Sequence, residues 1–75
     1  MSIKEQVTEI ISKKCNVKNI NENDELTALG LDSLDLVESL LEIEDKLGIQ
    51  FESNEMMELK TIKQVLDLIE KKKQQ

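Results

Sequence analysis

A serine at the start of a helix-forming segment is the side chain in this sequence best placed to do chemistry. Ser33 stands between Asp32 and Leu34, after a stretch rich in Asn, Asp and Glu and before a run with helical periodicity. A hydroxyl at such a junction often serves only to cap the helix. It can also be a point of covalent modification, because a loop next to it gives another enzyme access. The second use requires Ser33 to be exposed in the folded chain.

The composition excludes most ways in which this serine could act as a catalyst. The chain has no His and one Cys, so Ser-His pairs, Cys-His pairs and zinc sites of the Cys/His kind cannot form. A serine nucleophile at a sharp strand-to-helix turn would also need Gly two positions to each side. Those positions hold Leu31 and Asp35. We therefore predict that the chain is not an enzyme and has no metal site.

Carboxylates line the segment that follows the serine. From Asp32 to Leu47 there are six acids and one Lys, so this segment carries a local charge of −5 in a chain whose formal charge is −6. Spacings of three and four residues place four of the acids on one stripe of a helix, with a fifth beside it. The stripe consists of Asp35, Glu38, Glu42 and Asp45, flanked by Glu44. Such a charge repels nucleic acids and anionic lipids, so we expect basic protein partners, no nucleic acid and no membrane insertion.

Helical periodicity and capping residues predict the elements that must position these side chains. The absence of Pro and the abundance of Leu, Ile, Glu and Lys favour helix throughout. We expect helices at about residues 2–15, 33–47, 53–58 and 61–73, capped by Ser2, Asp32, Ser53 and Thr61, with a long loop over residues 16–30. The expected core faces are Ile3, Val7, Ile10 and Ile11 in the first helix, Leu36, Leu40, Ile43 and Leu47 in the second, and Ile62, Val65, Leu68 and Ile69 in the fourth. The expected fold is all-α, with one domain over residues 1–75.

The run from Leu29 to Asp35, Leu-Gly-Leu-Asp-Ser-Leu-Asp, resembles the phosphopantetheine attachment motif of acyl carrier proteins. The order of the predicted elements resembles that family over nearly the whole chain. The resemblance implies a four-helix bundle of acyl-carrier type, with a long first loop and a short third helix. It also implies that a phosphopantetheinyl transferase attaches a 4'-phosphopantetheine arm from coenzyme A to Ser33, with Asp32 and Leu34 completing the motif. The thiol of the arm would then carry acyl groups as thioesters to acyl-transferring and acyl-modifying enzymes.

The resemblance also implies a docking face and an acyl pocket. In the family, basic patches on partner enzymes recognise the motif helix. The matching positions here are Leu34, Asp35, Val37, Glu38, Leu41, Glu44 and Asp45, to which the acidic stripe adds Glu42. Residues that could line a pocket for an acyl chain are Leu26, Leu40, Met56, Met57, Leu59, Val65 and Leu68, although ordinary core packing explains the same residues more simply.

Several functional interpretations stay open on the sequence. The first is a carrier in fatty-acid or related acyl biosynthesis. The same attachment chemistry serves carriers of aminoacyl, peptidyl, D-alanyl or polyketide groups, and a non-carrier helical module could also bind a basic partner through its acidic face. We expect the chain to be a monomer. We expect it in the reducing cytoplasm, because one Cys cannot form an internal disulfide and no N-terminal apolar stretch resembles a signal peptide or a membrane span.

Overall fold

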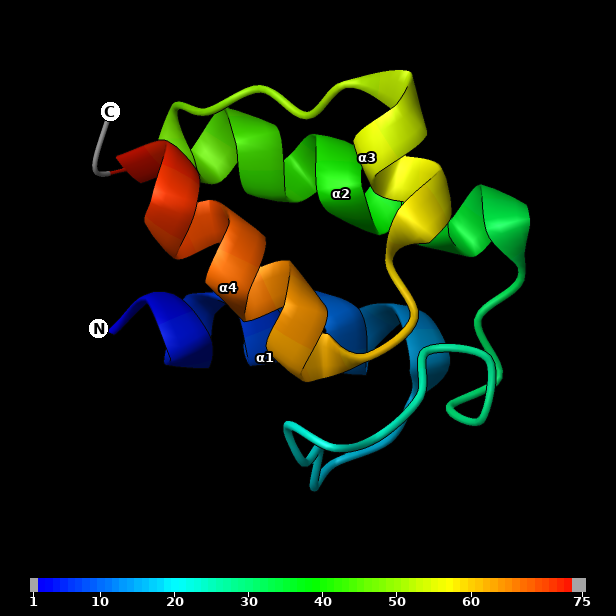
Figure 1. Ribbon diagram of the computed structural model, residues 1–75. Coiled ribbons are helices and arrows are strands. Elements are labelled where there is room, and N and C mark those ends of the chain that lie inside the picture. The colour runs from blue at the N-terminus through cyan, green and yellow to red at the C-terminus, as the bar shows by residue number, and fades with distance from the viewer. Residues whose placement is uncertain (1, 74–75) are drawn as a thin grey trace.

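The computed structural model describes residues 2–73, which form four helices joined by loops (Figure 1). The helices are α1 (Ile3–Cys15), α2 (Ser33–Leu47), α3 (Ser53–Glu58) and α4 (Ile62–Lys73). Over these residues no strand forms, and one isolated bridge joins Glu25 to Thr61. Figure 1 shows α4 crossing between α1 and α2, with the short α3 beside the first half of α2. The predicted all-α fold, its long first loop and its short third helix are confirmed.

Local side-chain caps define three helix starts, as the sequence predicts. The hydroxyls of Ser2 and Thr61 and the carboxylate of Asp32 each accept the backbone N–H three positions along, at 3.1, 3.2 and 2.8 Å. Such caps satisfy backbone donors that have no partner within the helix. The helix α2 ends at Gly48, whose φ of 69° lies in the left-handed region that glycine adopts without steric cost.

The start of α3 corrects one prediction. Ser53 does not cap this helix but is its first residue, and Glu52 occupies the cap position. The N–H of Glu52 donates to the carboxylate of Glu55 at 2.8 Å, and Lys72 of α4 reaches the same oxygen at 2.8 Å. The ammonium of Lys72 and, next, the N–H of Glu52 lower the pKa of Glu55. Since α3 has no buried residue, this link to α4 helps to position it, together with Met56, which packs partly against the core.

The hydrophobic core lies where α1, α2 and α4 face one another. Its buried residues are Val7, Ile10, Ile11, Leu26, Leu31, Leu40, Ile43, Phe51, Ile62, Val65 and Ile69. The predicted faces of the three long helices supply most of them, and the remaining members of those faces are partly buried against the cluster. Leu31 and Phe51 also enter the core, from loops, and were not predicted to do so.

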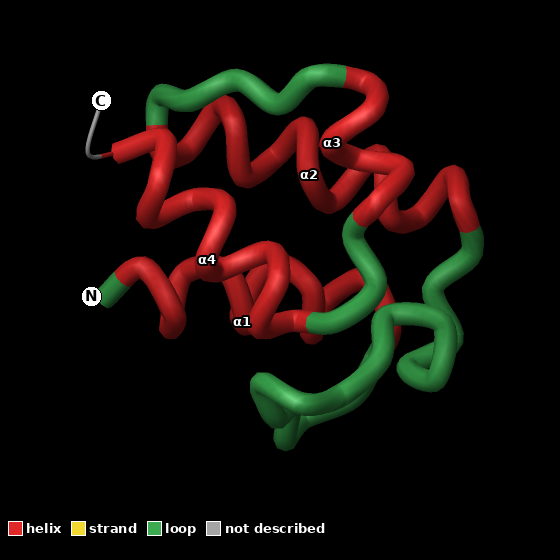
Figure 2. Tube along the Cα trace, in the orientation of Figure 1, coloured by secondary structure: helices red, strands yellow, loops and turns green. Residues whose placement is uncertain are grey.

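The long loop between α1 and α2 is fixed to the start of α4 (Figure 2). Backbone hydrogen bonds of 2.8, 3.2 and 2.8 Å join Leu26 to Lys60, Ile62 to Asp24 and Lys63 to Glu22. The side chain of Leu26 is buried, and those of Ile20 and Leu29 pack partly against the core. The loop therefore reaches α2 from a defined position rather than as a free segment.

Candidate functional site

Ser33 is the first residue of α2, and it is exposed. Just before it, Leu31 is buried, while Gly30 turns the chain with a φ of 90°. The backbone of this junction is thus anchored from the core side by Leu31. The hydroxyl of Ser33 makes no hydrogen bond with any residue in the range 2–73, so it meets the requirement of access for another enzyme.

The N-terminus of α2 keeps unpaired backbone donors beside this hydroxyl. Asp32 accepts the N–H of Asp35 through its carboxylate and the N–H of Leu36 through its carbonyl, at 2.8 and 2.9 Å. The N–H groups of Ser33 and Leu34 have no acceptor within the described part of the chain. These donors and the positive end of the helix dipole would favour an anion attached to Ser33.

Two hollows open beside Ser33, and the serine lines both of them. One, of about 590 Å³, lies between α2 and the loops that precede α2 and α4, with apolar walls from Leu26, Leu31, Leu36 and Leu59. The other, of about 460 Å³, lies between α2 and α3 and is lined by Ser33, Leu36, Val37, Ser53, Met56 and Met57. An arm on this serine therefore has two mainly apolar surfaces within immediate reach.

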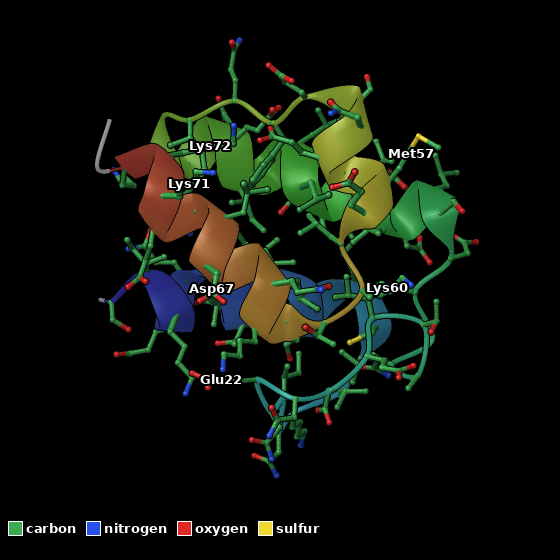
Figure 3. All side chains as sticks on the ribbon, viewed as in Figure 1. Glu22, Met57, Lys60, Asp67, Lys71 and Lys72 are labelled. Atoms are coloured by element: carbon green, nitrogen blue, oxygen red, sulfur yellow. The ribbon has the colours of Figure 1, made fainter. Side chains whose placement is uncertain are left out.

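The seven residues suggested for an acyl pocket divide between these hollows and the core. Leu26 and Leu59 line the hollow between α2 and the loops. Met56 and Met57 line the hollow between α2 and α3. Neither hollow is lined by Leu40, Val65 or Leu68; the first two are fully buried and the third packs against the core. Met57 is 84% exposed and points outward from α3 (Figure 3), so it forms the outer lip of its hollow rather than a wall inside it. The role of the other residues in holding an acyl chain stays a prediction.

The apolar residues of the predicted docking face are exposed on α2. Leu34, Val37 and Leu41 have exposed fractions of 67, 38 and 50%, whereas Leu40 and Ile43 on the opposite face are fully buried. Large apolar side chains exposed to solvent together on one helix face are typical of a contact surface. Their use by a partner stays a prediction.

The acidic stripe of α2 is partly neutralised from within the molecule. Lys14, in the last turn of α1, places its ammonium 4.0 Å from a carboxylate oxygen of Glu38 and 3.7 Å from one of Glu42. Glu44 is partly buried, and its carboxylate accepts the N–H of Phe51. Glu44 therefore has a structural task in addition to any role in docking. Sequence reasoning missed Lys14, because its position depends on how α1 packs against α2.

Three further properties of residues 2–73 bear on function: the lone cysteine, the grouping of metal-ligating side chains and the length of the apolar helices. Cys15 is a free thiol, partly buried against the core, which fits the packing role expected for a small apolar side chain. Within residues 2–73, His, Cys, Asp and Glu side chains nowhere gather in a group of three or more that could hold a metal ion. Across the same range, no helix is long and apolar enough to cross a membrane.

Comparison with known proteins identifies the family. Residues 5–69 match the family model described as the phosphopantetheine attachment site. The chain is 35% identical over 72 residues to an acyl carrier protein homolog of Mycoplasmopsis pulmonis, covering 96% of this chain and 97% of that protein. It is 43% identical over 49 residues to an acyl carrier protein of Coprothermobacter proteolyticus, covering 65% of this chain and 60% of that one.

A solved structure agrees with these sequence relatives. The crystal structure of an acyl carrier protein from Thermotoga maritima superposes with a TM-score of 0.84 at 25% identity, covering 93% of this chain and 85% of that one. The prosthetic group that defines the matched family is phosphopantetheine. Together with the exposed serine at the open end of α2, these matches show that the chain belongs to the acyl carrier protein family.

Proposed function

We propose that Ser33 is the attachment residue and that this chain carries acyl intermediates as thioesters on a 4'-phosphopantetheine arm. The observation that carries the proposal is the unengaged, exposed hydroxyl of Ser33 at the N-terminus of α2, inside the region that matches the attachment-site family. The arm supplies a thiol at the end of a flexible tether. The chain itself supplies the attachment point, a docking surface for partner enzymes and hollows that can shield the acyl group.

The residues around Ser33 fit a phosphopantetheine group. The hydroxyl oxygen of Ser33 would form the phosphodiester, and the two free N–H groups of Ser33 and Leu34 would donate to its phosphate oxygens. Asp32 would hold the helix start in place as its cap. An acyl chain on the arm would be shielded in one of the two hollows, where Leu26 and Leu59 or Met56 offer apolar contact.

We further propose that partner enzymes dock on α2. Charge on Asp35 and Asp45 would steer a basic patch toward the helix, and Leu34, Val37 and Leu41 would supply the area that is buried on contact. The partners are a phosphopantetheinyl transferase and enzymes that transfer or modify acyl groups. We expect the carrier to act as a monomeric domain, in the cytoplasm.

Mass spectrometry tests the attachment residue directly. Incubation of the apo chain with coenzyme A, magnesium and a broad-specificity phosphopantetheinyl transferase is expected to add the mass of one phosphopantetheine group. Ser33→Ala should abolish this gain. Ser53→Ala is the matched control, because Ser53 is also exposed, also begins a helix and lines the same hollow. A gain that survives Ser33→Ala, or one lost in Ser53→Ala as well, would contradict the assignment.

Fatty-acid or related acyl biosynthesis is the pathway that we propose for this carrier. Support comes from the acids of α2 and from relatives named simply as acyl carrier proteins, among them one from Solidesulfovibrio magneticus, 32% identical over 76 residues. Dedicated aminoacyl, peptidyl, D-alanyl or polyketide carriers share the attachment chemistry. Loading assays that compare an acyl transferase with amino-acid-adenylating enzymes separate these cases, and the intact mass of protein from its native host would identify the cargo. Loading only by an adenylating enzyme would overturn the pathway assignment.

A further inference from the structure

The carboxylates of α2 differ in how much of their charge is available to another protein. Lys14 lies 4.0 Å from Glu38 and 3.7 Å from Glu42, and its side chain is only 28% exposed. The two carboxylate side chains remain about half exposed, at 48 and 53%. The middle of the acidic stripe therefore has a counter-ion of its own, held in place by the packing of α1 against α2.

The two ends of the stripe have no such counter-ion. Among the described residues, neither Asp35 nor Asp45 forms an ion pair, and Asp32 adds a third carboxylate next to Ser33. Asp45 follows Asp35 by ten helix positions, which is about 15 Å along the axis. Between these ends, Val37 and Leu41 are exposed. The surface thus consists of two anionic ends on either side of a half-neutralised, partly apolar centre.

We propose that Lys14 is an internal counter-ion that competes with the cationic side chains of a docking partner for Glu38 and Glu42. The proposal rests on the proposed function, in which α2 is the docking face. Lys14 lowers the affinity of this chain for any basic surface that bears on the middle of α2. It favours partners whose cations are about 15 Å apart along the helix and flank an apolar contact. Lys14 is in this sense a specificity-determining residue, although it lies on α1.

A matched pair of substitutions isolates this effect. Lys14→Gln and Lys13→Gln both remove one positive charge from the last turn of α1. Lys13, however, pairs with Glu9 of its own helix, at 3.7 Å, and its side chain is 72% exposed. The two variants therefore have the same net charge and differ in which carboxylates they release. Lys14→Arg keeps the charge and should behave like the unaltered chain.

The first measurement uses a short oligolysine peptide as the probe, with NMR shifts of the apo chain as the readout. At low ionic strength, Lys14→Gln should bind the peptide about two- to five-fold more tightly than the unaltered chain, with the largest shifts at Glu38 and Glu42. Lys13→Gln should show a smaller gain in peptide affinity, with its largest NMR shifts at Glu9. High salt should remove the difference, because it screens exposed charges beyond a few ångströms. Equal gains in the two variants would overturn the proposal.

The second measurement uses the phosphopantetheinyl transferase and coenzyme A. Under the proposed docking over Val37 and Leu41, the basic surface of the transferase bears on the middle of α2. Lys14→Gln should therefore raise kcat/KM for modification by a similar factor at low salt, whereas Lys14→Arg should leave it unchanged. A lower or unchanged kcat/KM in Lys14→Gln would count against competition by Lys14. If no variant is modified at all, the proposed function fails, but the oligolysine titration still decides the role of Lys14. Thermal melts of each variant establish that the compared chains are folded.

Discussion

Two adjacent leucines of α2 provide a direct test of how the helix is oriented. Leu40 is fully buried, and Leu41, the next residue, is 50% exposed. Truncating a buried Leu to Ala costs about 2–5 kcal/mol, because apolar contact is lost and a cavity remains. For Leu40→Ala we expect about 3 kcal/mol, which lowers Tm by roughly 12–24 °C in a domain of this size. A chain of this length is stable by only about 4–11 kcal/mol, so this is a large share of the total.

Leu41→Ala makes the same chemical change with a different expected result. A half-exposed Leu loses less apolar contact on truncation and leaves no cavity, so we expect a cost below about 1 kcal/mol. Thermal and urea unfolding followed by circular dichroism measure both variants. The rate of modification by the transferase, measured where both variants are folded, should be affected in the opposite way. Leu41→Ala should be modified more slowly than Leu40→Ala, because it removes a docking contact. Equal destabilisation by the two substitutions would refute the assigned orientation of α2.

Further substitutions and conditions test the caps and the charges. Gly48→Ala should cost about 1 kcal/mol in urea unfolding, since a φ of 69° disfavours a side chain even though open space would receive the Cβ atom. Lys72→Gln should move the pKa of Glu55, followed by NMR titration, back up toward its usual value of 4.5. Because that pKa is lowered on folding, the stabilisation from Glu55 should be present above pH 4.5 and vanish as the pH falls through the lowered value. Added NaCl or magnesium should raise Tm by screening repulsion within α2; an unchanged melt would contradict this.

Features that depend on a few neighbouring residues could be predicted from the sequence. The caps formed by Ser2, Asp32 and Thr61 join side chain and backbone three positions apart, so their signal lies within one turn. The core faces of the long helices follow from periodicity for a similar reason. Ser53 was predicted wrongly as a cap because the start of α3 uses Glu52 and Glu55 instead. Part of that arrangement comes from α4, which the local sequence does not reveal.

Features that depend on packing between elements could not be predicted in the same way. Leu31 and Phe51 enter the core from loops, where no periodicity distinguishes a buried apolar residue from an exposed one. The contact of Lys14 with Glu38 and Glu42 joins two helices whose residues are far apart in the sequence. No local sequence motif indicates such a contact. The exposure of Met57 follows from the position of α3, whose six residues are too few for a clear periodic pattern.

The tertiary setting distinguishes Ser33, the proposed attachment residue, from the hydroxyl at the start of α4. Thr61 also lies at a helix start, but it is partly buried and its hydroxyl accepts an N–H of α4. The first two N–H groups of α4, those of Ile62 and Lys63, donate to carbonyls of the long loop. The same loop, bound in this way to α4, supplies no acceptor to the N–H groups of Ser33 and Leu34, which have none within residues 2–73. One segment thus closes one helix terminus and leaves the other open to an anion, a difference that cap residues alone do not encode.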